Sequence, residues 1–223
     1  VIAIEKVAHQ YGYMISVCNT SDDTQKEKEI IEKLIQQRVD GFIIGPTIQG
    51  KENTGMIRRL EIPYVIIERP LKGIEAYDFI SSDNWGAGYM AVKHLLECGH
   101  RRIGFIGWET SIANVDDRLK GYQSALKEAG VDPDKNLIQV GELSREAGYR
   151  LTAQLMEQPD VTAIAMAHHI SAEGSVIYLR ERGVKIPEDI SAVVIGTPKW
   201  AEMHAPRFTC IKQTEEKIGE RAA

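Results

Sequence analysis

The sequence has 223 residues, of which 43% are hydrophobic and 26% are charged. These proportions are typical of a globular protein with one large or two modest domains, and they exclude the disordered and fibrous classes. The formal net charge of −5 argues against this segment being itself a nucleic-acid-binding surface. No apolar run reaches the roughly 18–20 residues that a membrane span requires.

The first third of the sequence alternates short apolar runs with amphipathic segments. The chain opens inside a helix, and Tyr13–Cys18 is typical of a strand followed by a polar turn. Isoleucine and leucine recur at helical spacing between residues 24 and 37, which predicts a helix. The next expected elements are a strand ending at Gly45, a helix over 51–60 and a strand over Tyr64–Ile67.

The remainder of the sequence continues this pattern with longer helices. Helices are predicted at 84–98, 116–129, 145–157 and 171–182, and strands at 103–106, 162–166 and 191–195. Strands that are apolar on both faces, between amphipathic helices, indicate parallel sheets covered on each side. A turn-like segment separates two groups of strands. We therefore expect an α/β fold of two doubly wound parallel-sheet lobes, with a ligand cleft between them lined by strand carboxyl ends.

The sequence lacks the phosphate-binding and nucleophile motifs of common α/β enzymes. GxxxxGK[ST], GxGxxG at a strand-to-helix turn and GxSxG are all missing. The adjacent His168 and His169 follow a predicted strand, so in an extended chain their side chains point to opposite sides. We expect them to line a cleft rather than share a metal ion. The sequence thus predicts no enzyme, no cofactor and no metal site.

Arg118 follows a polar loop near the carboxyl end of a predicted strand and begins a helix. Two interpretations remain open. The side chain forms a surface ion pair with Asp116 or Asp117, or its planar guanidinium binds the hydroxyls or carboxylate of a ligand.

The three cysteines, Cys18, Cys98 and Cys210, lie in or beside apolar runs and have no CxxC spacing. This pattern predicts reduced thiols in the core of a cytoplasmic protein. The first and last residues both fall inside expected helices, so we expect the sequence to be part of a longer protein.

Several segments together resemble a known family. They are Ser82-Asp83-Asn84, the Gly99–Gly107 run, Arg118 with Gly121-Tyr122, Leu179–Ser191 and Phe208–Gln213. In order and over nearly the whole chain, these matches are similar to the core domain of lactose/galactose-repressor-type (LacI-type) transcription regulators. The resemblance implies a type I periplasmic-binding-protein-like fold. Its N-terminal lobe comprises 1–81 plus 213–223 and lacks a first strand, and its C-terminal lobe comprises 82–212.

The resemblance also implies a set of site residues. It places eight residues at or beside the effector-binding positions of the family, namely Arg118, Glu68, His168, His169, Leu143, Gly196, Asn114 and Gln213. The residues that it places at the crossings between lobes are Ser81, Ser82 and Lys212.

Three features depart from the family pattern. Family members commonly read Ala-Asn-Asp where this chain has Ala167-His168-His169, carry an aspartate near Gly196, and often place an aromatic ring at Leu143. A neutral sugar favours paired carboxylate acceptors and an aromatic surface, so a plain hexose is disfavoured. We expect a polar ligand such as a sugar phosphate or sugar acid, bound by Arg118 with His168 or His169 and Lys199. A pocket that binds nothing remains an alternative.

The resemblance predicts the effector-binding and dimerisation core of a cytoplasmic transcription regulator. Its partners would be a small effector, a second copy through the helix at 24–37, and operator DNA through a helix-turn-helix segment outside this sequence. The alternative is an extracytoplasmic sugar-binding protein of a transporter, which shares the fold. A signal peptide or a helix-turn-helix upstream would distinguish them.

Overall fold

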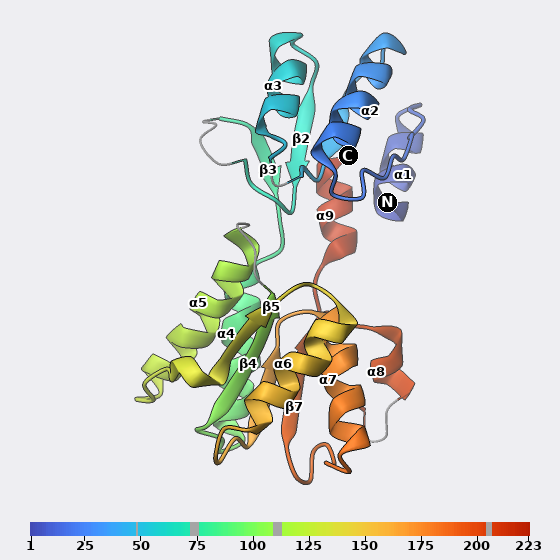
Figure 1. Cartoon of the computed structure of the whole chain (residues 1–223). Helices are drawn as coiled ribbons and strands as arrows, with labels where there is room; N and C mark the ends of the chain where they lie inside the picture. The colour runs from blue at the N-terminus through green and yellow to red at the C-terminus, as the bar shows by residue number, and fades with distance from the viewer. Residues whose placement is uncertain (48, 72–75, 109–112, 204–206) are drawn as a thin grey trace. The chain divides into compact units, whose positions relative to one another are not determined.

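The computed structural model describes residues 1–47, 49–71, 76–108, 113–203 and 207–223, apart from the side chains of 113–116. The chain divides into two compact units. Unit 1 consists of Val1–Ser82, Ser111–Ala113 and Thr214–Ala223, and unit 2 consists of Asp83–Thr110 and Asn114–Gln213. Figure 1 labels their helices and several of their strands. None of the helices in the described ranges has the length and apolar character needed to cross a membrane.

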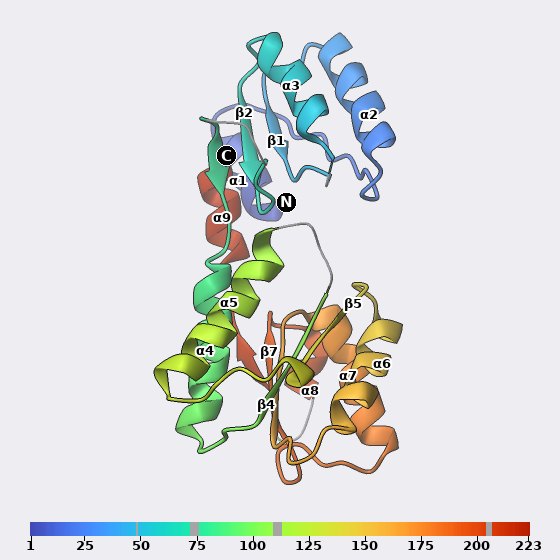
Figure 2. The ribbon, with the colours of Figure 1, turned by 60° about the vertical axis from the view of Figure 1, so that its left-hand side comes forward.

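Unit 1 is built on a parallel sheet in the order β1-β2-β3. Isoleucines from the sheet and from two helices, among them Ile31, Ile57 and Ile66, form its core. Figure 2 shows α2 and α3 on one side of this sheet and α1 and α9 on the other, with α9 packed beside α1. The elements are α1 (Ile2–Gln10), α2 (Thr24–Gln36), β1 (Phe42–Ile44), α3 (Lys51–Arg59), β2 (Tyr64–Ile67), β3 (Asp78–Ile80) and α9 (Glu215–Ala222).

The strand predicted at Tyr13–Cys18 is wrong. This segment is irregular, and its apolar side chains lie in solvent, with Met14 97% and Val17 66% exposed. A strand needs a neighbour to accept and donate its backbone hydrogen bonds, and in the described ranges no strand pairs with this segment. The third strand of the unit is instead β3, which the sequence did not predict.

Unit 2 is built on a parallel sheet in the order β5-β4-β6-β7-β8. The predictions of strands at 103–106, 162–166 and 191–195 and of four long helices are confirmed within a few residues. The elements are α4 (Asn84–Glu97), β4 (Ile103–Trp108), α5 (Ala113–Glu128), a 3-10 turn (Lys135–Leu137), β5 (Ile138–Gly141), α6 (Arg145–Met156), β6 (Ala163–Met166), α7 (His169–Glu181), β7 (Ser191–Ile195), α8 (Lys199–Met203) and β8 (Thr209–Ile211).

Both faces of the unit 2 sheet are buried. Phe105 packs in one core cluster with residues of α4 and α5, whereas its neighbour Ile106 packs in a second cluster with residues of α6 and α7. Figure 2 shows these helix pairs on opposite sides of the sheet. Because alternate side chains of each strand enter different cores, the strands are apolar throughout. The prediction of parallel sheets covered by helices on both faces is confirmed.

Helices α4 and α5 cross in close contact because glycine stands at the crossing. A Cβ atom at Gly88 would lie 2.1 Å from the carbonyl oxygen of Arg118, and one at Gly121 would lie 2.1 Å from that of Trp85. Only glycine avoids these overlaps, so the two helices approach backbone to backbone. The crossing fixes Arg118 next to the beginning of α4.

Candidate functional site

Strands β4 and β6 lie side by side in the sheet. The helices that follow them in the chain cover opposite faces of that sheet. Helix α5 after β4 packs on the same core as α4, whereas α7 after β6 packs with α6. Open α/β sheets bind ligands outside the strand carboxyl ends at such a switch point. Trp108 ends β4 there, and Ala167 and His168 follow β6. This edge of the sheet is the candidate site.

Arg118 lies at this edge and is buried, with 5% of the residue exposed. Its Nε donates a hydrogen bond to Oδ1 of Asn84 over 2.8 Å, and its Nη1 donates to the carbonyl oxygen of Ala167. The guanidinium carbon lies 5.4 Å from the ring centroid of Trp108, within cation–π range. The site thus holds a permanent positive charge in a fixed orientation.

The burial of Arg118 disfavours the interpretation of a solvent-exposed surface ion pair. Asp117 instead pairs with Lys120 at 3.0 Å, and the side chain of Asp116 lies outside the described residues.

The two histidines lie together, so the prediction that they point to opposite sides is wrong. Their rings stack with centroids 4.2 Å apart and planes inclined by 28°. The reason is that the chain is not extended through both positions: His168 is the N-cap of α7 and His169 begins the helix. The rings of Trp108 and His168 form a T-shaped contact, with centroids 5.1 Å apart and planes inclined by 75°. An indole and two imidazoles therefore form one continuous aromatic group beside Arg118.

His168 is neutral at physiological pH. Burial lowers its pKa to about 3, and the neighbouring His169 and Arg118 contribute further. Its Nδ1 accepts a hydrogen bond from the backbone N–H of Ile170 at 3.1 Å, so the neutral ring carries its proton on Nε2. His168 can therefore offer a hydrogen-bond donor to a ligand but no charge, which corrects the expectation that it helps Arg118 to attract an anion.

The other predicted residues of unit 2 lie after its strands. Gly196 follows β7 with φ of +110°, a conformation that favours glycine, and a Cβ there would lie 3.5 Å from Nδ1 of His169. Leu143 follows β5 and is 40% exposed. Lys212 and Gln213 follow β8. The side chain of Asn114 falls outside the described residues.

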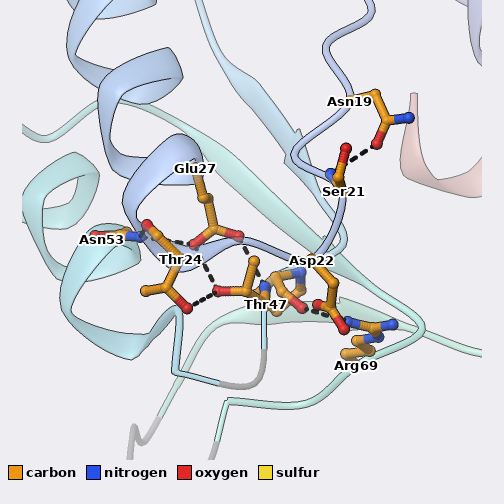
Figure 3. A network of polar contacts seen from close by, with 9 residues as sticks. Asn19, Ser21, Asp22, Thr24, Glu27, Thr47, Asn53 and Arg69 are labelled. Atoms are coloured by element: carbon orange, nitrogen blue, oxygen red, sulfur yellow. Dashed lines mark hydrogen bonds and ion pairs between the residues drawn. The ribbon is translucent and has the colours of Figure 1, made fainter.

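The predicted residues of unit 1 lie after β2 and β3. Glu68 follows β2 with φ of +61° and accepts a hydrogen bond from Oγ of Ser82 at 3.1 Å. Ser81 Oγ donates to the carbonyl oxygen of Ser82 at 3.3 Å. The next residue after Glu68, Arg69, forms an ion pair with Asp22 at 2.5 Å, as Figure 3 shows.

A buried carboxylate joins α2, α3 and the turn after β1 in unit 1 (Figure 3). Glu27 is 2% exposed and accepts hydrogen bonds from the backbone N–H of Thr47 at 2.7 Å and from Nδ2 of Asn53 at 2.9 Å. These two donors compensate for its loss of hydration. The network fixes the backbone where β1 ends.

The described residues offer no metal site. Within the ranges that the structure covers, no three side chains of histidine, cysteine, aspartate or glutamate are grouped so that they could hold an ion.

Comparison with known proteins identifies the family. A family model described as "Periplasmic binding proteins and sugar binding domain of LacI family" matches residues 1–222. The chain belongs to this family. Its two parallel sheets with flanking helices are the fold expected of a LacI-family core.

Named relatives of this LacI-family chain are regulators of transcription. The HTH-type transcriptional repressor PurR of Haemophilus influenzae is 29% identical over 223 residues, which cover 99% of this chain and 66% of the relative. The HTH-type transcriptional regulator DegA of Bacillus subtilis is 31% identical over 220 residues, which cover 97% of this chain and 65% of DegA. The chain thus spans slightly less than two thirds of the length of these relatives.

Solved structures agree with this assignment. The transcription regulator CcpA of Lactococcus lactis has a TM-score of 0.89 at 25% identity, with 99% of this chain and 81% of that one covered. A LacI-family transcriptional regulator from Enterococcus faecium with bound ribose has a TM-score of 0.86 at 26% identity. The match covers 99% of this chain and 80% of that regulator. These similarities favour a regulator over a transporter component.

Sequence analysis did not assign Trp108 or Asn84 to the site. The strand predicted at 103–106 stops two residues before the end of β4, so it does not include the tryptophan at the carboxyl end of that strand. Extending the predicted strand to the next polar residue would have placed the tryptophan at the site. Asn84 belongs to one of the segments that carry the family resemblance, but its sequence position alone gives no sign that its side chain accepts a hydrogen bond from Arg118.

Proposed function

We propose that this LacI-family chain is the effector-binding and dimerisation core of a cytoplasmic transcription regulator that has no enzymatic activity. Its effector would be a small polar molecule, a sugar or an acidic sugar derivative. The lobes would comprise 1–81 plus 213–223 and 82–212. Operator DNA would be bound by a segment outside this sequence, as the names of the HTH-type relatives suggest.

The observation that carries the proposal is the buried guanidinium of Arg118 at the switch point of the unit 2 sheet. A planar cation held by a side-chain amide and a backbone carbonyl is oriented before a ligand arrives, which reduces the entropy lost on binding. A guanidinium binds carboxylate and phosphate oxygens strongly, and it also donates to hydroxyls. The ribose in the Enterococcus faecium relative is consistent with a ligand rich in hydroxyls.

The aromatic group beside Arg118 supports a sugar-like ligand. Trp108, His168 and His169 present ring surfaces and one Nε2–H donor beside the cation, with no added charge from His168. Such surfaces pack against the C–H faces of a sugar ring while the polar groups bind its hydroxyls. This arrangement compensates for the aromatic ring that Leu143 does not supply.

Calorimetric titration tests the ligand class. Ribose and other neutral sugars are compared with their phosphates and carboxylic acids, and a change in tryptophan fluorescence that is absent in Trp108→Phe reports occupancy. We expect acidic derivatives to bind about tenfold more tightly than their neutral counterparts, and we expect Arg118→Lys to reduce that preference, because an ammonium keeps the charge but not the planar set of donors. Lys120→Arg, a change at an exposed residue of the same helix, is the control. Binding of neutral sugars without their acids would contradict the acidic preference, and binding of nothing would contradict an effector site.

The regulatory part of the proposal rests on thermodynamic linkage. An effector changes operator affinity only if it binds the two conformations of the regulator with different affinity. In the full-length protein, operator binding should therefore change at saturating effector concentration, and sedimentation should show a dimer. A monomer whose DNA binding is independent of every bound ligand would contradict this role.

A further inference from the structure

Unit 2 contains a cavity of about 260 Å³ that the effector proposal does not use. Its walls include the first residues of β7 and β8, so it opens at the amino ends of these strands. Arg118 and Trp108 lie at the carboxyl ends, at the opposite edge of the sheet. The cavity is lined by His94, Leu95, Cys98, Ile186, Pro187, Ser191, Ala192, Val193, Arg207, Phe208 and Thr209.

The floor of the cavity is apolar. Leu95, Val193 and Phe208 are 2%, 1% and 9% exposed, and Ile186 and Pro187 complete the wall. A cavity of roughly 150 Å³ in a protein core holds a benzene molecule. A volume of about 260 Å³ therefore accommodates a small ring, or a short hydrocarbon chain, with one polar substituent.

The rim of the cavity is basic. Arg207 and His94 are exposed there, and none of the described lining residues is an aspartate or a glutamate, although the whole chain carries a net charge of −5. Within the described ranges, the guanidinium of Arg207 has neither an ion-pair partner nor a hydrogen-bond acceptor. An exposed guanidinium above an apolar floor is complementary to an anion that carries a hydrocarbon group.

We propose that this cavity binds a small amphipathic carboxylate. The hydrocarbon part would occupy the apolar floor, and the carboxylate would pair with the guanidinium of Arg207. This second site lies apart from Arg118 and does not depend on the proposed effector role.

Cys98 supplies a readout of occupancy that requires no other activity. It lines the cavity, its residue is exposed, and its Sγ lies 3.9 Å from Nε2 of His94. Cys18 is also exposed but belongs to unit 1 and is an internal control in the same sample. Cys210 is only partly exposed, and burial raises the pKa of its thiol, so it should react more slowly.

The experiment measures alkylation of each cysteine by iodoacetamide, a neutral reagent, with peptide mass spectrometry. Benzoate is compared with benzamide, which has the same ring and no charge, at millimolar concentrations expected for so small a ligand. At ten times its dissociation constant, benzoate should slow the alkylation of Cys98 about tenfold and leave Cys18 unchanged. Arg207→Gln should weaken benzoate binding about tenfold. The control variant Arg180→Gln, which removes an exposed arginine on α7, should leave benzoate binding unchanged.

Three results would overturn the proposal. If benzamide protected Cys98 as well as benzoate does, the cavity would bind the apolar ring without preferring a negatively charged ligand. Equal protection of Cys18 would show a non-specific effect. Failure of benzoate and of hexanoate to protect Cys98 would show that neither a ring nor a chain carboxylate binds. Because Arg118→Lys should retain the protection, these outcomes are separate from those that test the effector site.

Discussion

Acidification should destabilise unit 2 through His168. Its pKa is about 3 in the folded protein, against an ordinary value of 6.5 that the unfolded chain retains. Between these values the unfolded chain binds a proton that the folded chain does not, so the stabilisation is complete above pH 6.5 and is lost as the pH falls toward 3. From pH 7 to pH 5 the free energy of unfolding should fall by about 2 kcal/mol, at about 1.4 kcal/mol for each of roughly 1.5 pH units.

Urea unfolding followed by tryptophan fluorescence measures this loss in unit 2 alone. The three tryptophans, Trp85, Trp108 and Trp200, all belong to that unit. His168→Asn removes the titrating ring and keeps an acceptor at the N-cap. Between pH 7 and pH 5, the free energy of unfolding of the unsubstituted protein should fall by about 2 kcal/mol more than that of this variant. His9→Asn, which changes an exposed histidine of unit 1, should behave as the unchanged protein. Equal losses in all three proteins would refute the reasoning.

Three substitutions test other parts of the structure. Arg118→Met should destabilise unit 2 by about 3 kcal/mol in urea unfolding, because it leaves buried acceptors without their donor; a loss below about 0.5 kcal/mol would show that those bonds contribute little. Glu27→Gln should cost about 1–3 kcal/mol, read by circular dichroism or hydrogen exchange in unit 1, since an amide N–H₂ would face the donors that the carboxylate accepts. Gly88→Ala should destabilise by more than about 2 kcal/mol, because its Cβ would lie 2.1 Å from a carbonyl oxygen, whereas Gly55→Ala, with its nearest atom at 3.8 Å, should stabilise helix α3 by about 0.5–1 kcal/mol. Similar effects at the two glycines would contradict the close crossing of α4 and α5.

Most of the fold could be predicted because local signals agree with it. The strand predicted at Tyr64–Ile67 is β2, and the helix predicted at 145–157 differs from α6 by one residue. The helical spacing of apolar residues and the capping residues predict these helices. At the beginning of α6, for example, Oγ of Ser144 accepts a hydrogen bond from the backbone N–H of Ala147. Tyr13–Cys18 has the same local pattern, but a strand also needs a pairing partner, which no local pattern supplies. β3 and β8 have only three residues each, too few to show a period.

The site was predicted less completely because it depends on contacts between distant residues. The position of Arg118 near a strand end could be inferred, but not the carbonyl of Ala167, 49 residues away, that accepts its hydrogen bond. The stacked histidines could not be inferred, because the change from strand to helix falls at His168 itself. Cys18 and Cys98, expected in the core, are exposed because Cys18 lies in the irregular segment between α1 and α2, and Cys98 lies at the C-terminal end of α4.

The division of the chain has a consequence for the order of folding. The residues of unit 2 lie almost entirely within the stretch from Asp83 to Gln213, whereas unit 1 also requires Thr214–Ala223. Helix α9 packs beside α1, and Gly219 approaches the Cβ atom of Ala3 from the other end of the chain. During synthesis, the side of α1 that packs on α9 therefore stays uncovered until residues 215–222 have been made, and closing so long a loop is slow. Ribosome-bound chains that end before α9 should hold unit 2 native and unit 1 incomplete, a state in which chaperones would find α1 accessible.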